Sequence, residues 1–218
     1  MGEDLLGEIV KAVDSGDMAL TDRLTRRAVD SGFELMDIVE KGLNEGMKGV
    51  GEKFERGEYF LCELLTAADA MKAGLAIVEP LFKEKGLKRK TIGRVVMGTV
   101  QGDIHDIGKS IVATTLSMEG FELIDLGFDV PNDEFVKAVE KYQPNILGMS
   151  SLLSVTRPRQ QEVIELLRKA GLRDKVKVMI GGAITSQEYC EKIGADAYAA
   201  DAIEAVATAK NLLGIKEG

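Results

Sequence analysis

The chain contains few of the residue types that build metal clusters or disulfide frameworks. Its 218 residues include one histidine, two cysteines and no tryptophan. Cys62 and Cys190 are far apart in the sequence and neither belongs to a C-x-x-C pair, so neither a disulfide framework nor a cysteine-based zinc site is expected. We expect both thiols to be reduced and buried.

The sequence also lacks an excess of positive charge and a long apolar run. Acidic residues outnumber basic ones by 36 to 28, which gives a net charge of −8 and argues against a nucleic-acid-binding surface. No apolar run approaches the ~18 residues of a membrane span. The N-terminal stretch MGEDLLGEIVKAVDSGD is acidic where a secretory signal is basic. We therefore expect a cytoplasmic protein that binds neither nucleic acid nor membranes.

Up to residue 86 the apolar residues follow helical spacing, which predicts a helical domain over residues 1–86 built as a four-helix bundle. The tripeptide Asp-Ser-Gly closes the first two helices, so Gly16 and Gly32 are expected to be left-handed C-caps. Glycines in the third helix predict a flat face for the close approach of a neighbour. They are Gly42, Gly46 and Gly49. The expected helices span residues 3–14, 17–31, 34–55 and 60–85.

A charged run, KEKGLKRK at residues 83–90, indicates a linker, which we place at residues 87–92. Over residues 93–218 short apolar runs then alternate with helical patterns. This alternation predicts an α/β fold that is Rossmann-like (flavodoxin-like), with a doubly wound five-stranded parallel sheet. The expected strands are residues 94–100, 121–127, 145–151, 175–182 and 196–200. The expected helices are residues 107–119, 132–142, 157–170, 186–193 and 201–213.

In such sheets ligands bind where strands end and helices begin, and the only histidine lies in one of these loops, within GDIHDIGKS. The Gly-Lys-Ser ending is typical of a phosphate-binding loop, but Asp103 occupies the position where that motif needs glycine. A zinc or iron site using Asp103, His105 and Asp106 lacks further histidines. A third interpretation is a histidine that only satisfies hydrogen bonds within its loop.

The same loop resembles the cobalamin-binding signature of base-off, histidine-on corrinoid proteins, in which Asp-x-His-x-x-Gly is followed by Ser-x-Leu and then by Gly-Gly. All three parts occur here in that order, each at the end of a predicted strand. The matching positions are Asp103-x-His105-x-x-Gly108, Ser150-x-Leu152 and Gly181-Gly182. 

The helical half is similar to the cap domain of cobalamin-dependent methionine synthase and of the small corrinoid proteins of methylamine and methanol methyltransferase systems. Residues 50–75, VGEKFERGEYFLCELLTAADAMKAGL, carry that similarity. Cys62 departs from it, because the family usually has proline there. The resemblance covers nearly the whole chain.

The resemblance implies that cobalamin is the cofactor and that His105 is its lower cobalt ligand. Asp103 then receives the other imidazole proton, and Thr156 stands where the family has a relay serine, so these two form a proton relay. Phe60 and Met71 are the residues implied to shield the upper face. The other implied cofactor contacts are Gly102, Ile104, Asp106, Ile107, Gly108, Ser150, Leu152, Ser154, Gly181, Gly182, Tyr198 and Ala202.

The function that the resemblance implies is that of a methyl carrier, which alternates between methyl-cobalt(III) and cobalt(I) and is not catalytic alone. Its implied partners are a substrate-specific methyltransferase, a methyl-acceptor methyltransferase and a reductive activator protein. A cobalamin-dependent sensor shares the fold, but a basic helix-turn-helix is not found in the sequence. A small subunit of an adenosylcobalamin mutase shares the histidine loop, but the helical half counts against it. The loop around His105 looks most like those of methylamine systems.

Overall fold

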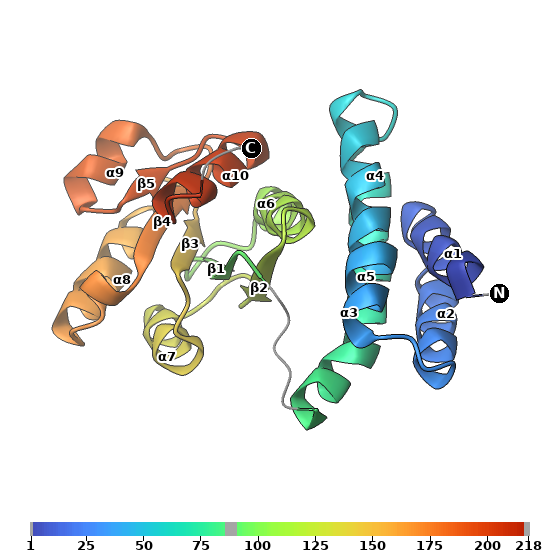
Figure 1. Cartoon of the computed structure of the whole chain (residues 1–218). Helices are drawn as coiled ribbons and strands as arrows, with labels where there is room; N and C mark the ends of the chain where they lie inside the picture. Colours follow the sequence, from blue (N-terminus) through green and yellow to red (C-terminus); the bar gives the residue numbers. More distant parts are fainter. Residues whose placement is uncertain (1, 86–90, 216–218) are drawn as a thin grey trace. The chain divides into compact units, whose positions relative to one another are not determined.

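The computed structural model describes residues 2–85 and 91–215. The chain divides into two compact units, Met1–Lys90 and Thr91–Gly218 (Figure 1). Residues 87–90 of the predicted linker lie outside the described residues.

The first unit is a bundle in which each predicted helix is present. The third helix differs from the prediction, because it begins as α3, widens into a π-helical segment, η1, and continues as α4. Such π-helical turns occur mostly as short interruptions of α-helices. The elements are α1 (Gly2–Asp14), α2 (Met18–Asp30), α3 (Leu35–Asp37), η1 (Ile38–Asn44), α4 (Glu45–Glu55) and α5 (Leu61–Glu84) (Figure 1).

Glycines set the close packing of this bundle. Gly16 and Gly32 have φ angles of 69° and 80°, so both are left-handed caps as predicted. Two of the three glycines of the third helix pack against α1: a β-carbon added to Gly42 would lie 3.1 Å from Ile9 Cγ2, and one added to Gly46 would lie 2.8 Å from Val13 Cβ. Gly49 is different, because nothing lies within 4 Å of such an atom. The flat face therefore consists of the first two glycines only.

The second unit is the predicted doubly wound sheet, with all strands parallel and in the order β2-β1-β3-β4-β5 (Figure 1). The strands are β1 (Gly93–Thr99), β2 (Phe121–Asp125), β3 (Ile146–Ser150), β4 (Lys177–Gly181) and β5 (Ala197–Tyr198). The helices are α6 (Ile107–Met118), α7 (Asn132–Tyr142), α8 (Pro158–Lys169), α9 (Gln187–Ile193) and α10 (Ala202–Leu212), with a short 3₁₀ turn η2 (Arg173–Lys175). The last strand is shorter than predicted.

Helices cover both faces of this sheet, because successive strand side chains point to opposite sides. Val96, Leu147 and Val178 belong to one core, together with residues of α7, α8 and α9. Val95 and Ile146 belong to a second core with residues of α6 and α10. The strand order reverses between β1 and β3, which is where doubly wound folds bind ligands, at the carboxyl ends of the strands.

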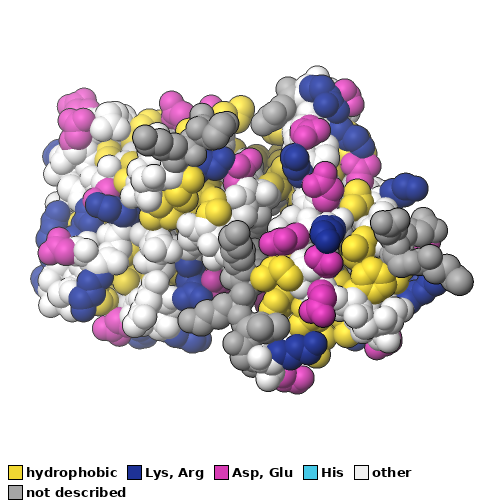
Figure 2. All heavy atoms as spheres, in the orientation of Figure 1, with side chains coloured by type: hydrophobic (Ala, Val, Ile, Leu, Met, Phe, Trp, Pro, Cys, Tyr) yellow, Lys and Arg dark blue, Asp and Glu magenta, His cyan; other side chains and the backbone are white. Residues whose placement is uncertain are grey.

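The surface charge agrees with the composition. In the view of Figure 2, Lys and Arg side chains are interspersed with Asp and Glu. None of the described helices combines the length and the apolar character that crossing a membrane requires.

The close approach of α1 to the third helix leads to a first prediction. Gly46→Ala should destabilise the protein by about 1–3 kcal/mol, because the new methyl group would overpack against Val13 and the carbonyl oxygen of Val10. Gly49→Ala is the matched control: its methyl group meets open space, and alanine favours helix by about 1 kcal/mol over glycine. Urea unfolding followed by far-UV circular dichroism measures both, and equal stabilities for the two variants would contradict the packing described.

Candidate functional site

The site centres on Asp103, in the loop between β1 and α6. Its carboxylate is completely buried, whereas the side chain of His105, two residues later, is 47% exposed. One carboxylate oxygen accepts a hydrogen bond from His105 Nδ1 at 2.8 Å and one from the His105 backbone N–H at 3.1 Å. The imidazole is therefore fixed through Nδ1, while nearly half of the side chain is exposed.

The second carboxylate oxygen binds the neighbouring loop, between β3 and α8. It accepts hydrogen bonds from the backbone N–H groups of Leu152 at 2.7 Å and Leu153 at 3.3 Å. It also accepts the hydroxyl of Thr156 at 2.9 Å. Asp103 thus joins the two loops that follow the adjacent strands β1 and β3.

The charge state of Asp103 determines the tautomer of His105. Burial raises the pKa of the Asp103 carboxyl, but the hydrogen bonds to its two oxygens outweigh burial and lower the pKa to about 2. At neutral pH this side chain is therefore an anion that only accepts hydrogen bonds. In a neutral imidazole the proton must then be on Nδ1, which leaves the lone pair on Nε2, at the outward edge of the ring.

A second hydroxyl extends this hydrogen-bond chain. Ser151 Oγ is completely buried and lies 2.9 Å from Thr156 Oγ1. Because a hydroxyl has one proton and the carboxylate is the stronger acceptor, Thr156 donates to Asp103 and accepts from Ser151. Sequence reasoning found Thr156 but missed Ser151. Ser151 could have been found as the second serine of SSLLS, because alternation along a strand turns its side chain to the face opposite that of Ser150.

The strand register brings three further small residues into one row. Thr99 pairs with Ser150, and Ser150 pairs with Gly181, at the carboxyl ends of β1, β3 and β4. By strand alternation their side chains share the face that α6 and α10 cover. Gly108 lies in the first turn of α6, and nothing lies within 4 Å of a β-carbon added to it. A glycine in a helix is costly and no packing contact explains this one.

Large apolar side chains are exposed on the three loops around His105. Ile104 and Ile107 are 67% and 65% exposed, beside the histidine in sequence. An exposed cluster of apolar side chains marks a ligand or partner site more often than chance. The others are Phe128 in the β2–α7 loop and Leu152, Leu153 and Val155 in the β3–α8 loop.

The remaining predicted contacts differ in their surroundings. The Gly102 backbone N–H donates to Asp129 Oδ1 at 2.7 Å, and its φ angle is 85°. Gly182, with a φ angle of 113°, has no room for a side chain, because a β-carbon would lie 1.9 Å from the Ser151 carbonyl oxygen. Asp106 precedes α6 and makes no side-chain capping bond. Ser154 is exposed, and Ala202 is the first residue of α10.

Tyr198 and Met71 both pack into hydrophobic cores. Tyr198 packs against the core under α7, α8 and α9, on the face opposite to the row of small residues, because it pairs with Ile180 rather than with Gly181. Met71 is 3% exposed and belongs to the core of the helical unit, whereas Phe60 in the same unit is 68% exposed. Of that pair, only Phe60 has an exposed side chain.

The described residues also bear on three other features of the sequence. The Asp103 carboxylate is buried and accepts a hydrogen bond from the His105 backbone N–H, which argues against a phosphate-binding loop here. Within residues 2–85 and 91–215, no group of three or more His, Cys, Asp or Glu side chains is placed to hold a metal ion. Cys190 is buried as expected, but Cys62 is exposed, since it lies in the first turn of α5, with Sγ 3.2 Å from Glu63 Oε2.

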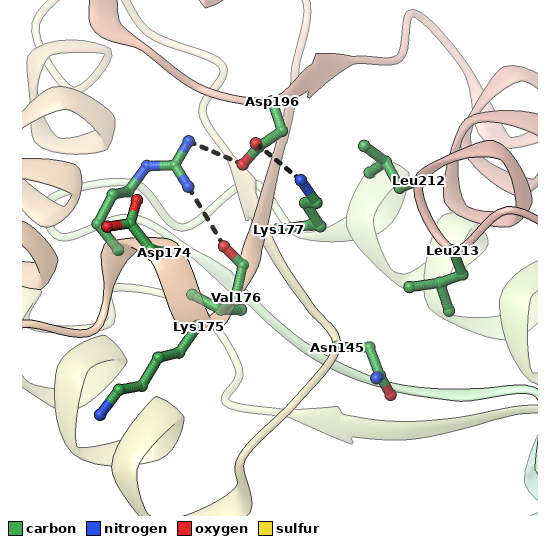
Figure 3. A pocket seen from close by; sticks show the side chains of 9 residues that line it. Asn145, Asp174, Lys175, Val176, Lys177, Asp196, Leu212 and Leu213 are labelled. Carbon is green, nitrogen blue, oxygen red and sulfur yellow. Dashed lines mark hydrogen bonds and ion pairs between the residues drawn. The ribbon is translucent and has the colours of Figure 1, made fainter.

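A cavity of about 300 Å³ lies at the other edge of the sheet, where β3, β4 and β5 begin (Figure 3). Its charged groups bind one another: Arg173 lies 2.7 Å from Asp196, and Lys177 lies 3.7 Å from the same carboxylate. These side chains tie the start of β4 to the start of β5. The cavity is therefore separate from the His105 site.

Family models match both units. A B12 binding domain model matches residues 93–207, and a second B12 binding domain model matches residues 5–79. A dimethylamine corrinoid protein of Methanosarcina barkeri is 46% identical over 211 residues, which cover 97% of this chain and 98% of that protein. A trimethylamine corrinoid protein of the same organism is 39% identical over 213 residues, with 98% of each covered.

Solved structures of related proteins are also similar to this chain. The methanol:cobalamin methyltransferase complex MtaBC from Methanosarcina barkeri contains a chain with a TM-score of 0.85 and 30% identity, over 98% of this chain and 81% of that one. The monomethylamine corrinoid protein of Methanosarcina barkeri has a TM-score of 0.55 and 34% identity, over 97% of this chain and 100% of that one.

The bonding of Asp103 leads to a second prediction. Asp103→Asn should lower the free energy of unfolding by about 1–3 kcal/mol, because an amide cannot accept all of these hydrogen bonds and its NH₂ group faces N–H donors. Asp106→Asn is the control, because it makes the same change in the same loop at a residue whose side chain makes no capping hydrogen bond to α6. Chemical denaturation compares the two, and a stability of Asp103→Asn equal to that of the control would show that the buried network contributes little.

Proposed function

Because the chain belongs to the family of B12-binding corrinoid proteins, we propose that it binds cobalamin with the nucleotide base displaced and carries a methyl group between two methyltransferases. The observation that carries this proposal is the pairing of His105 with Asp103. This pairing leaves the lone pair of Nε2 available to bind a metal, on a half-exposed imidazole at the carboxyl edge of the sheet.

The residues around His105 fit such a cofactor. The exposed apolar side chains Ile104, Ile107 and Leu152 suit the face of a large macrocycle. The open space at Gly108 suits a bound group, since packing within the chain does not account for this glycine. When bound, cobalamin supplies a cobalt atom that accepts and releases the methyl group.

In this proposal His105 is the lower cobalt ligand, and Nε2 is the ligating atom. A neutral imidazole is a suitable ligand for cobalt, and the hydrogen bond from its other nitrogen to a carboxylate orients the ring and makes it more basic. Asp103 and Thr156 hold the proton at Nδ1. Ser151 orients the Thr156 hydroxyl and so belongs to the same chain.

The row Thr99, Ser150 and Gly181 is the proposed position of the nucleotide tail. Ser150 carries a hydroxyl that can bond the displaced base, while Gly181 and Gly182 offer bare backbone to the tail. Gly102, Asp106, Ser154 and Ala202 flank this region in the loops and at the start of α10. Phe60 is proposed to shield the upper face of the corrin.

The partner assignment rests on the names of the relatives. They include dimethylamine and trimethylamine corrinoid proteins and a chain of a methanol:cobalamin methyltransferase complex. We therefore propose a methylamine-specific methyltransferase as the methyl donor enzyme, a second methyltransferase for the acceptor, and a reductive activator that restores cobalt(I). The substrate is chosen by the first partner.

The third prediction uses the fact that the chain has a single histidine. Protein made without a histidine tag, labelled with ¹⁵N-histidine and loaded with cob(II)alamin should show an electron paramagnetic resonance spectrum in which each cobalt line is split into a doublet. Unlabelled protein should show a triplet, because ¹⁴N has spin 1 and ¹⁵N has spin 1/2. A triplet in both samples would mean that the nucleotide base and not His105 binds cobalt.

The fourth prediction concerns methyl transfer. Holoprotein reduced to cobalt(I) should be converted to the methylated form, followed by absorption spectroscopy, when a methylamine-specific methyltransferase and its substrate are added. His105→Ala should slow this conversion without abolishing it, since the cobalt(I) form carries no axial ligand. The absence of methylation with methylamine and with methanol enzymes alike would count against the carrier role and leave cofactor binding intact.

A further inference from the structure

Arg157, Ile184 and Tyr189 form a cluster, here called the clasp, between the start of α8 and the β4–α9 loop. Arg157 Nη1 donates to the Ile184 carbonyl oxygen at 3.2 Å, and its guanidinium lies over the Tyr189 ring, 4.6 Å from the centroid. In return the Tyr189 hydroxyl donates to the Arg157 carbonyl oxygen at 2.9 Å. Three contacts thus join one arginine to the neighbouring loop and to α9.

The clasp is held by directional contacts and not by an ion pair. Among the side chains that the structure describes, none of the carboxylates lies within 4.0 Å of the Arg157 guanidinium. Burial raises the pKa of the Tyr189 hydroxyl, so this group stays protonated and keeps its hydrogen bond. A planar guanidinium can stack on a ring and donate at its edge at the same time, which lysine cannot do.

The two loops that the clasp joins also touch at their bases. Gly182 passes so close to the Ser151 carbonyl oxygen that a β-carbon would lie 1.9 Å from it. Thr185 closes the turn by donating its hydroxyl to the Gly182 carbonyl oxygen at 2.6 Å. Arg157 then fixes the outer part of the same loop through Ile184. The β4–α9 loop is therefore held at both ends against the loop that carries Thr156.

The clasp is adjacent in sequence to the hydrogen-bond chain of Thr156, Asp103 and His105. Arg157 directly follows Thr156, whose hydroxyl donates to Asp103, and Asp103 orients His105. On its other side the clasp braces the loop that begins with Gly181 and Gly182. The contacts lie on the α8–α9 side of the sheet, behind the row of small residues.

We propose that Arg157 is a positioning residue for the nucleotide tail of the cofactor, because it fixes the Gly181–Gly182 loop relative to the Thr156–Asp103–His105 chain. This inference rests on the proposed function, which places the tail beside that loop. It assigns to Arg157 no contact with the cofactor, only the geometry of the loop that borders it.

The test compares two cofactors that differ only in the tail: cobalamin and cobinamide, which lacks the nucleotide. Arg157→Gln should weaken cobalamin binding about tenfold and leave cobinamide binding unchanged. Arg159→Gln is the matched control, because Arg159 lies in α8, two residues after Arg157, and outside the clasp. Its side chain pairs with the partly exposed Glu162. This variant should change neither affinity.

Tyr189→Phe provides a second variant that keeps the ring and removes one hydrogen bond, so its loss of cobalamin affinity should be smaller and again specific to cobalamin. Equal losses for cobalamin and cobinamide would reduce Arg157 to a structural residue, and no loss for either would overturn the inference. Wild-type protein that binds cobinamide as tightly as cobalamin would instead overturn the placement of the tail in the proposed function.

Discussion

The whole site depends on one buried negative charge. A carboxylate without exposure to water is tolerated only when hydrogen bonds replace its hydration, and Asp103 obtains them from two loops. Those loops follow β1 and β3, which are neighbours in the sheet although about fifty residues apart in sequence. The reversal of strand order at this point therefore brings the backbone donors of Leu152 and Leu153 to the carboxylate. The position of His105 follows from that arrangement.

Backbone geometry shapes the region beside the histidine in a similar way. Parallel register aligns Thr99, Ser150 and Gly181 across three strands, and each is small. Gly182 lies against the Ser151 carbonyl oxygen with a φ angle that other residues rarely adopt. Substitution there would disturb the fold before any ligand is considered. Gly108, in contrast, has open space around it, so the two kinds of glycine in the motif serve different purposes.

Much of this could be predicted from the sequence. The change from helical spacing to alternating strands and helices predicts the fold class, and Asp-Ser-Gly predicts the caps at Gly16 and Gly32. Contacts that depend on backbone groups or on distant packing could not be predicted. No side-chain pattern reveals that Leu152 donates its N–H to Asp103, or that Arg157 stacks on Tyr189.

Side-chain direction was also hard to predict from the sequence. Met71 lies at a helical position that suited an exposed role as well as a core one, and only the packing of the bundle decides between them. Tyr198 lies on the face opposite to the row of small residues, and this could not be predicted because the register of β5 against β4 is not visible in a run of five residues. The exposure of Cys62 reflects its place in the first turn of a helix rather than its chemistry.

The two carboxylate oxygens of Asp103 bind different parts of the structure. One holds the imidazole, and the other is bonded to a different loop, so the orientation of the ring is established when the chain folds. The conformational entropy of ordering His105 is then lost during folding and not during ligand binding. In the proposed function, cobalt would therefore meet an imidazole whose orientation the fold already sets. The histidine would in this sense be a preorganised ligand.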